Sequence, residues 1–112
     1  MTMKIETRMH NGYAVLSFLE DVALTSDISD LRDMISQYLD RDVRKIAIRF
    51  TSQSYLSSKS VGILLQCVES IREAGGKMAV ISPNADITDV LSTVYFSELV
   101  DSVSSLDELS DR

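Results

Sequence analysis

The sequence predicts an α/β protein with a small mixed β-sheet of four to five strands covered by helices, in the order β-β-α-β-α-β-α. A segment of alternating apolar and polar residues is followed by Asn11-Gly12, a pair typical of a two-residue hairpin turn. Further along, segments with the spacing of amphipathic helices alternate with short apolar segments. Strands joined by helical crossovers pair in parallel, so we expect one antiparallel hairpin to extend a parallel sheet.

The predicted hairpin comprises segments 3–9 and 13–19. In the first segment Met3, Ile5, Thr7 and Met9 alternate with polar residues, which indicates a half-buried strand. A polar link at 20–24 leads to a helix for which Thr25, Ser26 and Asp27 are candidate N-caps. Its apolar face comprises Ile28, Leu31, Ile35, Tyr38 and Leu39.

The remaining chain alternates strands and helices. Segment 45–50 is predicted to be a strand, and segment 58–74 a helix with Val61, Leu64, Leu65, Val68 and Ile71 on its apolar face. Gly75-Gly76 is expected to end this helix, because glycine readily adopts a left-handed backbone. A strand at 77–82 and a turn at 82–84 precede a helix at 86–94, which turns Ile87, Val90, Leu91 and Val94 inward. A short edge strand at 99–103 and a helical turn at 106–109 complete the prediction.

The length of 112 residues predicts a single domain, 1–112, in which residues 104–112 form a weakly ordered tail. The net charge of −6 and the lack of a basic run argue against nucleic acid or an anionic membrane as a partner. The chain has neither a signal-peptide pattern nor an apolar run long enough to span a bilayer, so we expect a cytoplasmic protein. We expect it to be a monomer or a weak dimer.

The sequence lacks the residue combinations that most enzyme classes need for catalysis. His10 falls in the hairpin turn, where we expect it to be solvated, and Cys67 falls in an apolar helical pattern, as a buried thiol does. The sequence has no metal-ligand cluster and no glycine-rich phosphate loop, so we expect neither metal, cofactor nor enzymatic activity. Ser57, Ser58 and Ser60 remain, at the start of the second helix, where a hydroxyl either caps the helix or takes part in binding.

The run from Tyr55 to Leu65, YLSSKSVGILL, resembles the STAS domain of the anti-sigma factor antagonist family. In that family a strand is followed by the turn aromatic-Ile-Asp-Ser-Ser-Gly-Leu-Gly and then by an apolar helix, Gly-Gly and another strand. The run aligns with the turn without a gap, and Gly75-Gly76 followed by Lys77 to Val80 matches the later part. The resemblance covers nearly the whole chain.

The resemblance implies a partner-switching function. In the family, a partner that is both an anti-sigma factor and a serine kinase phosphorylates the serine at the position of Ser58. Phosphorylation ends the binding and a phosphatase restores it. The partner-binding positions implied by the resemblance are Ser57, Ser58, Lys59, Ser60 and Gly62.

This sequence departs from the family motif at several positions. Ser57 replaces the family's aspartate, Lys59 its second serine and Ser60 its first glycine, while Arg49 replaces an acidic residue at the end of the preceding strand. Two alternatives to the phosphorylated switch follow from these departures. One is an interaction or scaffold module that is not phosphorylated. The other is an anion or nucleotide sensor that uses Arg49 and Lys59 as cationic groups.

Overall fold

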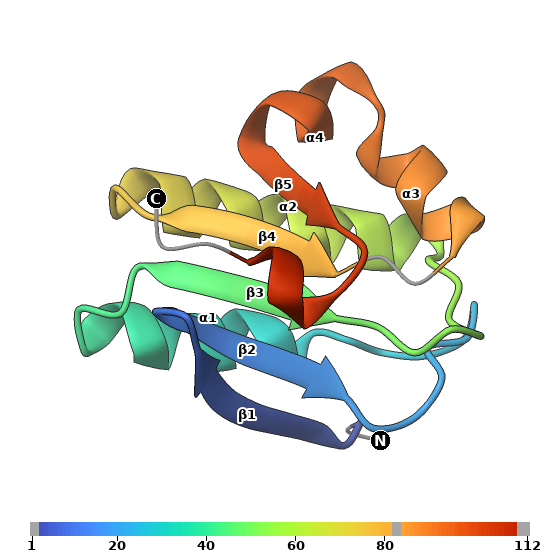
Figure 1. Ribbon diagram of the computed structural model, residues 1–112. Coiled ribbons are helices and arrows are strands. Elements are labelled where there is room, and N and C mark those ends of the chain that lie inside the picture. The colour runs from blue at the N-terminus through green and yellow to red at the C-terminus, as the bar shows by residue number, and fades with distance from the viewer. Residues whose placement is uncertain (1–2, 82–83, 110–112) are drawn as a thin grey trace.

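The computed structural model describes residues 3–81 and 84–109 (Figure 1). Five strands form one sheet in the order β1-β2-β3-β4-β5. Their bounds are Ile5–His10 (β1), Tyr13–Phe18 (β2), Lys45–Arg49 (β3), Lys77–Ile81 (β4) and Val100–Val103 (β5). β1 pairs antiparallel with β2, and the other neighbouring strands pair in parallel. The predicted α/β class with a small mixed sheet is confirmed.

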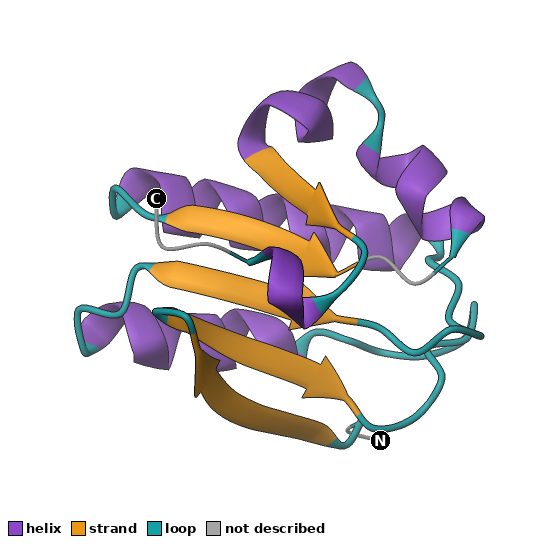
Figure 2. Ribbon diagram, in the orientation of Figure 1, coloured by secondary structure: helices purple, strands orange, loops and turns teal. Residues whose placement is uncertain are grey.

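The helices are Asp30–Asp40 (α1), Ser58–Glu73 (α2), Ala85–Leu91 (α3) and Val94–Leu99 (α4), and Leu106–Glu108 (η1) is a 3₁₀ turn. Figure 2 shows α1 and α2 together behind the sheet. This placement follows from the topology, because right-handed crossovers between strands added in one direction put their helices on the same face. None of the helices in the described residues combines the length and the apolar character needed to cross a membrane.

The hairpin turn forms as the sequence predicts, but β1 is less buried. Asn11 and Gly12 take the positive φ angles of 50° and 85° that a two-residue turn requires. Ile5 is half-buried, whereas Thr7 is exposed and Met9 is 59% exposed. The prediction of a buried face is therefore wrong for Thr7 and Met9. β1 is the edge strand of the sheet.

The polar residues before α1 build a loop instead of capping the helix. The Oγ of Ser26 accepts a hydrogen bond from the Ala23 N–H at 2.8 Å, and the Oδ1 of Asp27 accepts one from the Ser29 N–H at 2.9 Å. The N-cap is Ser29, whose own side chain makes no capping hydrogen bond. The prediction of a cap at 25–27 is therefore wrong, since local side-chain to backbone hydrogen bonds compete with helix formation there.

The helix predicted at 86–94 is replaced by two short helices, α3 and α4, with a break at Ser92 and Thr93. Ser92 Oγ donates to the Asp89 carbonyl at 2.8 Å, and extended Thr93 is the N-cap of α4. Ile87 and Leu91 are buried as predicted. The predicted inward direction of Val94 concerns a side chain outside the described part of the structure. The apolar spacing runs through the break, so the pattern did not reveal it.

Both faces of the sheet carry apolar clusters. The larger cluster fills the space between the sheet and the helices and includes Cys67, whose burial raises the pKa of its thiol to about 12. On the other face a smaller cluster comprises Tyr13, Val15, Ala47, Ala79, Ile81 and Leu109. The two alanines leave room there for the segment after β5, and Figure 1 shows η1 lying across this face.

Part of the segment predicted as a tail packs on the sheet. Asn11 Nδ2 donates to the Leu109 carbonyl at 2.9 Å, and the Leu109 side chain is buried. Ser105 and Glu108 form a capping box around η1. Residues 104–109 therefore adopt a defined structure, while the rest of the predicted tail, 110–112, lies outside the described residues.

Candidate functional site

Ser57, Ser58 and Ser60 lie at the edge of the sheet where the parallel strands end. The loop at residues 50–57 leaves the carboxyl end of β3, and the loop at 19–29 leaves that of β2. Since β2 and β3 are parallel, both loops emerge at the same edge. Ligands of open α/β sheets bind outside the carboxyl ends of the strands, which is where these serines lie.

Hydrogen bonds around Val22 and Ser54 hold these two loops together. Fully buried Ser54 accepts a hydrogen bond at its Oγ from the Val22 N–H at 3.0 Å, and the Val22 carbonyl accepts one from the Tyr55 N–H at 2.7 Å. Thr51 Oγ1 lies 2.7 Å from the Ser54 Oγ and donates to Asp21 Oδ1 at 2.6 Å. These hydrogen bonds hold the loop at 50–57, which leads into α2, against the loop that follows β2.

Asn84 connects a third segment to this pair of loops. Its Oδ1 accepts a hydrogen bond from the Ile87 N–H at 2.9 Å and so caps α3. Its Nδ2 donates to the carbonyls of Ser54 at 2.9 Å and Ser52 at 3.1 Å. A single side chain therefore ties the start of α3 to the loop that carries the serine cluster.

Replacing Ser54 should loosen this arrangement. We expect Ser54→Ala to lower the free energy of unfolding by about 1–3 kcal/mol, because it leaves the buried Val22 N–H without its acceptor. Exposed Ser52 offers a matched control, and Ser52→Ala should change stability by less than about 0.5 kcal/mol. Urea unfolding measures both values. An effect of Ser54→Ala no larger than that of the control would contradict the role of this hydroxyl.

The three serines at the start of α2 play different parts. Ser57 is the N-cap, and its Oγ accepts a hydrogen bond from the Ser60 N–H at 3.1 Å. Ser57 also donates from its Oγ to the Ser60 Oγ at 3.2 Å, and Ser60 is only 1% exposed. Ser58 is exposed, and its hydroxyl has no hydrogen-bond partner within residues 3–81 and 84–109. Ser57 is half-buried, so Ser58 is the most exposed of the three residues.

The backbone around Ser58 favours added negative charge. Ser58 and Lys59 occupy the first turn of α2, where N–H groups lack acceptors within the helix. The helix dipole adds a partial positive charge, and the first turn contains no acidic residue to compensate it. A phosphoryl group on the Ser58 hydroxyl would meet these groups without disturbing the core.

Lys59 and Arg49, the predicted cationic pair, lie on different sides of the sheet. Lys59 lies in the first turn of α2, on the side of the sheet that α1 and α2 cover. Hydrogen bonds from Ser29 lower the pKa of Asp27 in the loop before α1, and the charge of Lys59 lowers it further. Arg49 follows buried Ile48 and so points to the face opposite α2. There it lines a hollow of about 640 Å³ with residues that include Arg8. Arg49 does not share a site with Ser58.

Two exposed apolar side chains near Ser58 were missed by the sequence reasoning. Leu24 is 68% exposed and Tyr55 is 48% exposed, and the Val22–Tyr55 hydrogen bond holds their segments next to each other. In the sequence, Leu24 is the apolar residue that ends the polar link at 20–24, and Tyr55 follows the polar residues after the strand predicted at 45–50. We call the region formed by five exposed residues, Leu24, Asp27, Tyr55, Ser58 and Lys59, together with half-buried Gly62 the Ser58 surface.

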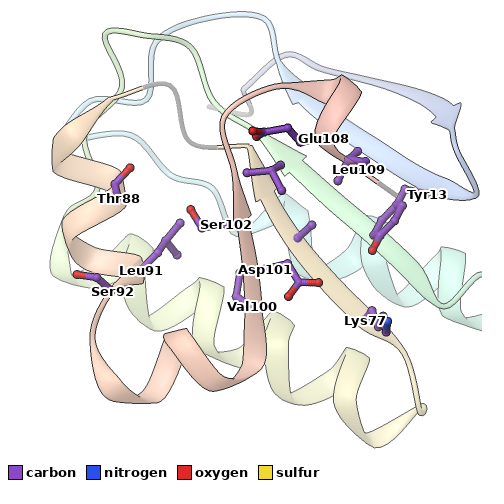
Figure 3. A pocket seen from close by; sticks show the side chains of 12 residues that line it. Tyr13, Lys77, Thr88, Leu91, Ser92, Val100, Asp101, Ser102, Glu108 and Leu109 are labelled. Atoms are coloured by element: carbon purple, nitrogen blue, oxygen red, sulfur yellow. The ribbon is translucent and has the colours of Figure 1, made fainter. Parts of the chain in front are cut away.

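A separate hollow of about 610 Å³ lies beside β5 (Figure 3). Its lining includes Tyr13, Lys77, Leu91, Asp101 and Leu109. Burial and the charge of Asp101 raise the pKa of the Tyr13 phenol. None of the Ser58 surface contributes to the lining. Within residues 3–81 and 84–109, no group of three or more His, Cys, Asp or Glu residues comes together to hold a metal ion.

Comparisons with known proteins agree with this architecture. The STAS domain model matches residues 4–109. A curated protein of Thermotoga maritima named "Putative anti-sigma factor antagonist" is 25% identical over 79 residues, which span 70% of this chain and 70% of that protein. A homologue from Thermotoga neapolitana is 26% identical over 83 residues, spanning 70% of this chain and 74% of the homologue.

Solved structures show the same fold. The crystal structure of the Thermotoga maritima protein described as "a putative anti-sigma factor antagonist" has a TM-score of 0.74 at 20% identity, over 93% of this chain and 89% of that one. Phosphorylated SpoIIAA, a Bacillus cell fate determinant, has a TM-score of 0.64 at 12% identity, over 93% and 95% of the two chains. The family match spans nearly the whole described chain. This protein therefore belongs to the STAS domain family, as an anti-sigma factor antagonist-like member.

Proposed function

We propose that this protein is a phosphorylation-controlled partner switch of the anti-sigma factor antagonist type, with Ser58 as the acceptor. The observation that carries the proposal is the difference in exposure and hydrogen bonding among the three serines. Ser57 caps α2 and Ser60 is buried, whereas the Ser58 hydroxyl is exposed in the first helical turn. The partner is an anti-sigma factor with serine kinase activity, and a phosphatase reverses the modification.

The reaction requires only a hydroxyl from this chain. The kinase transfers the γ-phosphoryl group of ATP to the Ser58 Oγ, a base of the kinase takes the hydroxyl proton, and ADP leaves. Hydrolysis by the phosphatase then releases inorganic phosphate and restores the hydroxyl.

The phosphoryl group acts on binding through charge and desolvation. It adds about −1.5 to −2 charge at Ser58. Exposed Tyr55 lies three residues before Ser58, and its N–H is hydrogen-bonded to the loop that carries exposed Leu24. A partner that covers those side chains must then bury the new charge, which is costly without a paired cation. The helix start accommodates the same charge locally, so the domain stays folded while the contact is lost.

Gly62 supports a close approach of the partner to α2. A Cβ added at this position would have no atom within 4 Å, so the fold itself leaves room for a larger residue. Glycine inside a helix costs about 0.5–1 kcal/mol relative to alanine. Gly62 lies one turn after Ser58 on the same helical face. A glycine that the core does not need is explained by a partner backbone that packs against this turn.

The phosphorylation test uses the cognate anti-sigma factor kinase with ATP and mass spectrometry. We expect one phosphate on the unmodified protein and on Ser52→Ala, and none on Ser58→Ala. Phosphorylation should weaken binding to the kinase at least about tenfold, because the kinase must desolvate the added charge and make room for the phosphoryl group. Ser58→Ala should still bind, since the hydroxyl is exposed and makes no hydrogen bond among the described residues.

The same experiment separates the switch from an interaction module without phosphorylation, which the substitutions at Ser57 and Lys59 favour. Phosphate that appears equally on Ser58→Ala would overturn the assignment of the acceptor. A module predicts no phosphate at all and equal partner binding by the unmodified protein, Ser58→Ala and Ser58→Asp. Loss of binding in Ser58→Asp alone supports the switch.

A further inference from the structure

Within residues 3–81 and 84–109, no strand lies beside the outer edge of β1, where the strand's backbone hydrogen-bonding groups face outward. β1 is the last strand of the sheet, and the Leu19 N–H donates to the Lys4 carbonyl at 3.0 Å. Backbone groups of successive residues in an antiparallel strand point alternately to the two sides. Lys4, Glu6 and Arg8 therefore point their backbone groups toward β2. The N–H and C=O groups of Ile5, Thr7 and Met9 point to the open edge.

One symmetric register matches these groups in two copies of the chain. If two β1 strands pair antiparallel about a twofold axis at Thr7, the two Thr7 residues face each other and Ile5 faces Met9 of the other copy. All three positions point to the open edge, so every facing pair exchanges both of its backbone hydrogen bonds. A twofold axis at Glu6 or at Arg8 would pair only two of these three positions.

The side chains favour the same register. Glu6 and Arg8 lie on one face of β1, where both are more than half exposed and their charged atoms lie 3.7 Å apart. With the axis at Thr7, Glu6 of each copy faces Arg8 of the other. An axis at Glu6 would place two glutamates opposite each other, and an axis at Arg8 two arginines, which is unfavourable. On the other face Ile5 meets the exposed Met9 side chain.

We propose that β1 is a self-association edge, at which a second copy of this chain joins its sheet through antiparallel β1–β1 pairing centred on Thr7. The axis is perpendicular to the sheet, so the helices of both copies lie on the same side. The opposite edge is less suited, because β5 has four residues against six in β1. The Ser58 surface, at the start of α2, stays open to its own partner.

Charge reversal tests the register without touching the core. Sedimentation velocity at low ionic strength should show a concentration-dependent dimer. We expect Glu6→Arg and Arg8→Glu each to weaken dimerisation by about tenfold or more, because each creates two pairs of like charges. An equimolar mixture of the two variants should form a heterodimer, since all facing pairs are then of opposite charge. The double variant Glu6→Arg/Arg8→Glu should also dimerise.

A backbone variant tests the hydrogen bonds independently. Thr7→Pro removes an N–H that points away from β2, so the monomer should keep its sheet while dimerisation is lost. An NOE between the Hα atoms of Glu6 and Arg8, measured between labelled and unlabelled copies, would establish the register directly. A wild-type monomer at about 1 mM protein, or a dimer unaffected by either charge variant, would overturn the proposal.

Discussion

Gly76→Ala is expected to lower the free energy of unfolding by about 3 kcal/mol, because the added methyl group has no space. A Cβ at this position would lie 2.2 Å from the Arg44 carbonyl oxygen and 3.0 Å from Cγ2 of Ile71. The Arg44 oxygen cannot move freely, since it accepts a hydrogen bond from the Lys77 N–H at 2.8 Å. The Gly76 N–H is held as well, at 2.8 Å from the Ile71 carbonyl. The substitution must therefore displace either the end of α2 or the entry to β3.

Gly62 provides the matched control. Gly62→Ala adds the same methyl group where no atom lies within 4 Å, in the second turn of α2. We expect it to raise the free energy of unfolding by about 0.5–1 kcal/mol, since alanine restricts the unfolded chain and favours the helix. Urea unfolding measures both changes, and the slope of the unfolding free energy against urea concentration should be compared between the variants. Losses of similar size in both variants would show that close packing at Gly76 is not the cause.

The fold could be predicted where one local rule dominated. Asn11-Gly12 admits a tight turn with positive φ, and regular apolar spacing marks α1 and α2. The break between α3 and α4 was not predicted, because Leu91 and Val94 keep helical spacing across it. The exposure of Met9 escaped because alternation shows that a strand has two faces but cannot show that it lies at the edge of the sheet.

The candidate site was predicted in part. A serine cluster at a helix start follows from the residues, but only tertiary contacts decide that Ser57 is the cap and that Ser60 is buried. Arg49 could have been separated from Lys59 by the sequence alone. Ile48 and Phe50 turn toward the helices, so strand alternation turns Arg49 away from them. Packing of the β2 and β3 loops, which brings Leu24 near Tyr55, left no local signature.

Tyr55→Ala is expected to weaken partner binding by about 30-fold or more, equivalent to about 2 kcal/mol, if the Ser58 surface is the docking site. Tyr55 combines a large apolar ring at 48% exposure with a backbone fixed by its hydrogen bond to Val22. Ordering this side chain on binding costs little, because tyrosine has only two χ angles, and tyrosine is enriched among the residues that dominate interfaces. Leu24→Ala should have a smaller effect of about fivefold, because it removes less area.

Calorimetric titration with the anti-sigma factor kinase measures these losses, and Met9→Ala is the control. Met9 is exposed to a similar extent but lies on β1, away from the start of α2. It should bind the kinase as the unmodified protein does. Unfolding experiments should place all three variants within about 1 kcal/mol of the unmodified protein, since each side chain is largely exposed. Equal losses from Tyr55→Ala and Met9→Ala would place the docking site elsewhere.

Combining Tyr55→Ala with phosphorylation tests whether both act on one contact. Changes at independent sites multiply their effects on the dissociation constant, whereas changes within one contact do not. Tyr55 lies three residues before Ser58, and its backbone is held by the hydrogen bond to Val22. A partner that buries the Tyr55 ring must therefore also cover the phosphoryl group. In Tyr55→Ala the partner has already lost this contact, and phosphorylation should weaken binding less than it does in the unmodified protein. Full multiplicative loss would mean that the phosphate acts at a surface separate from Tyr55.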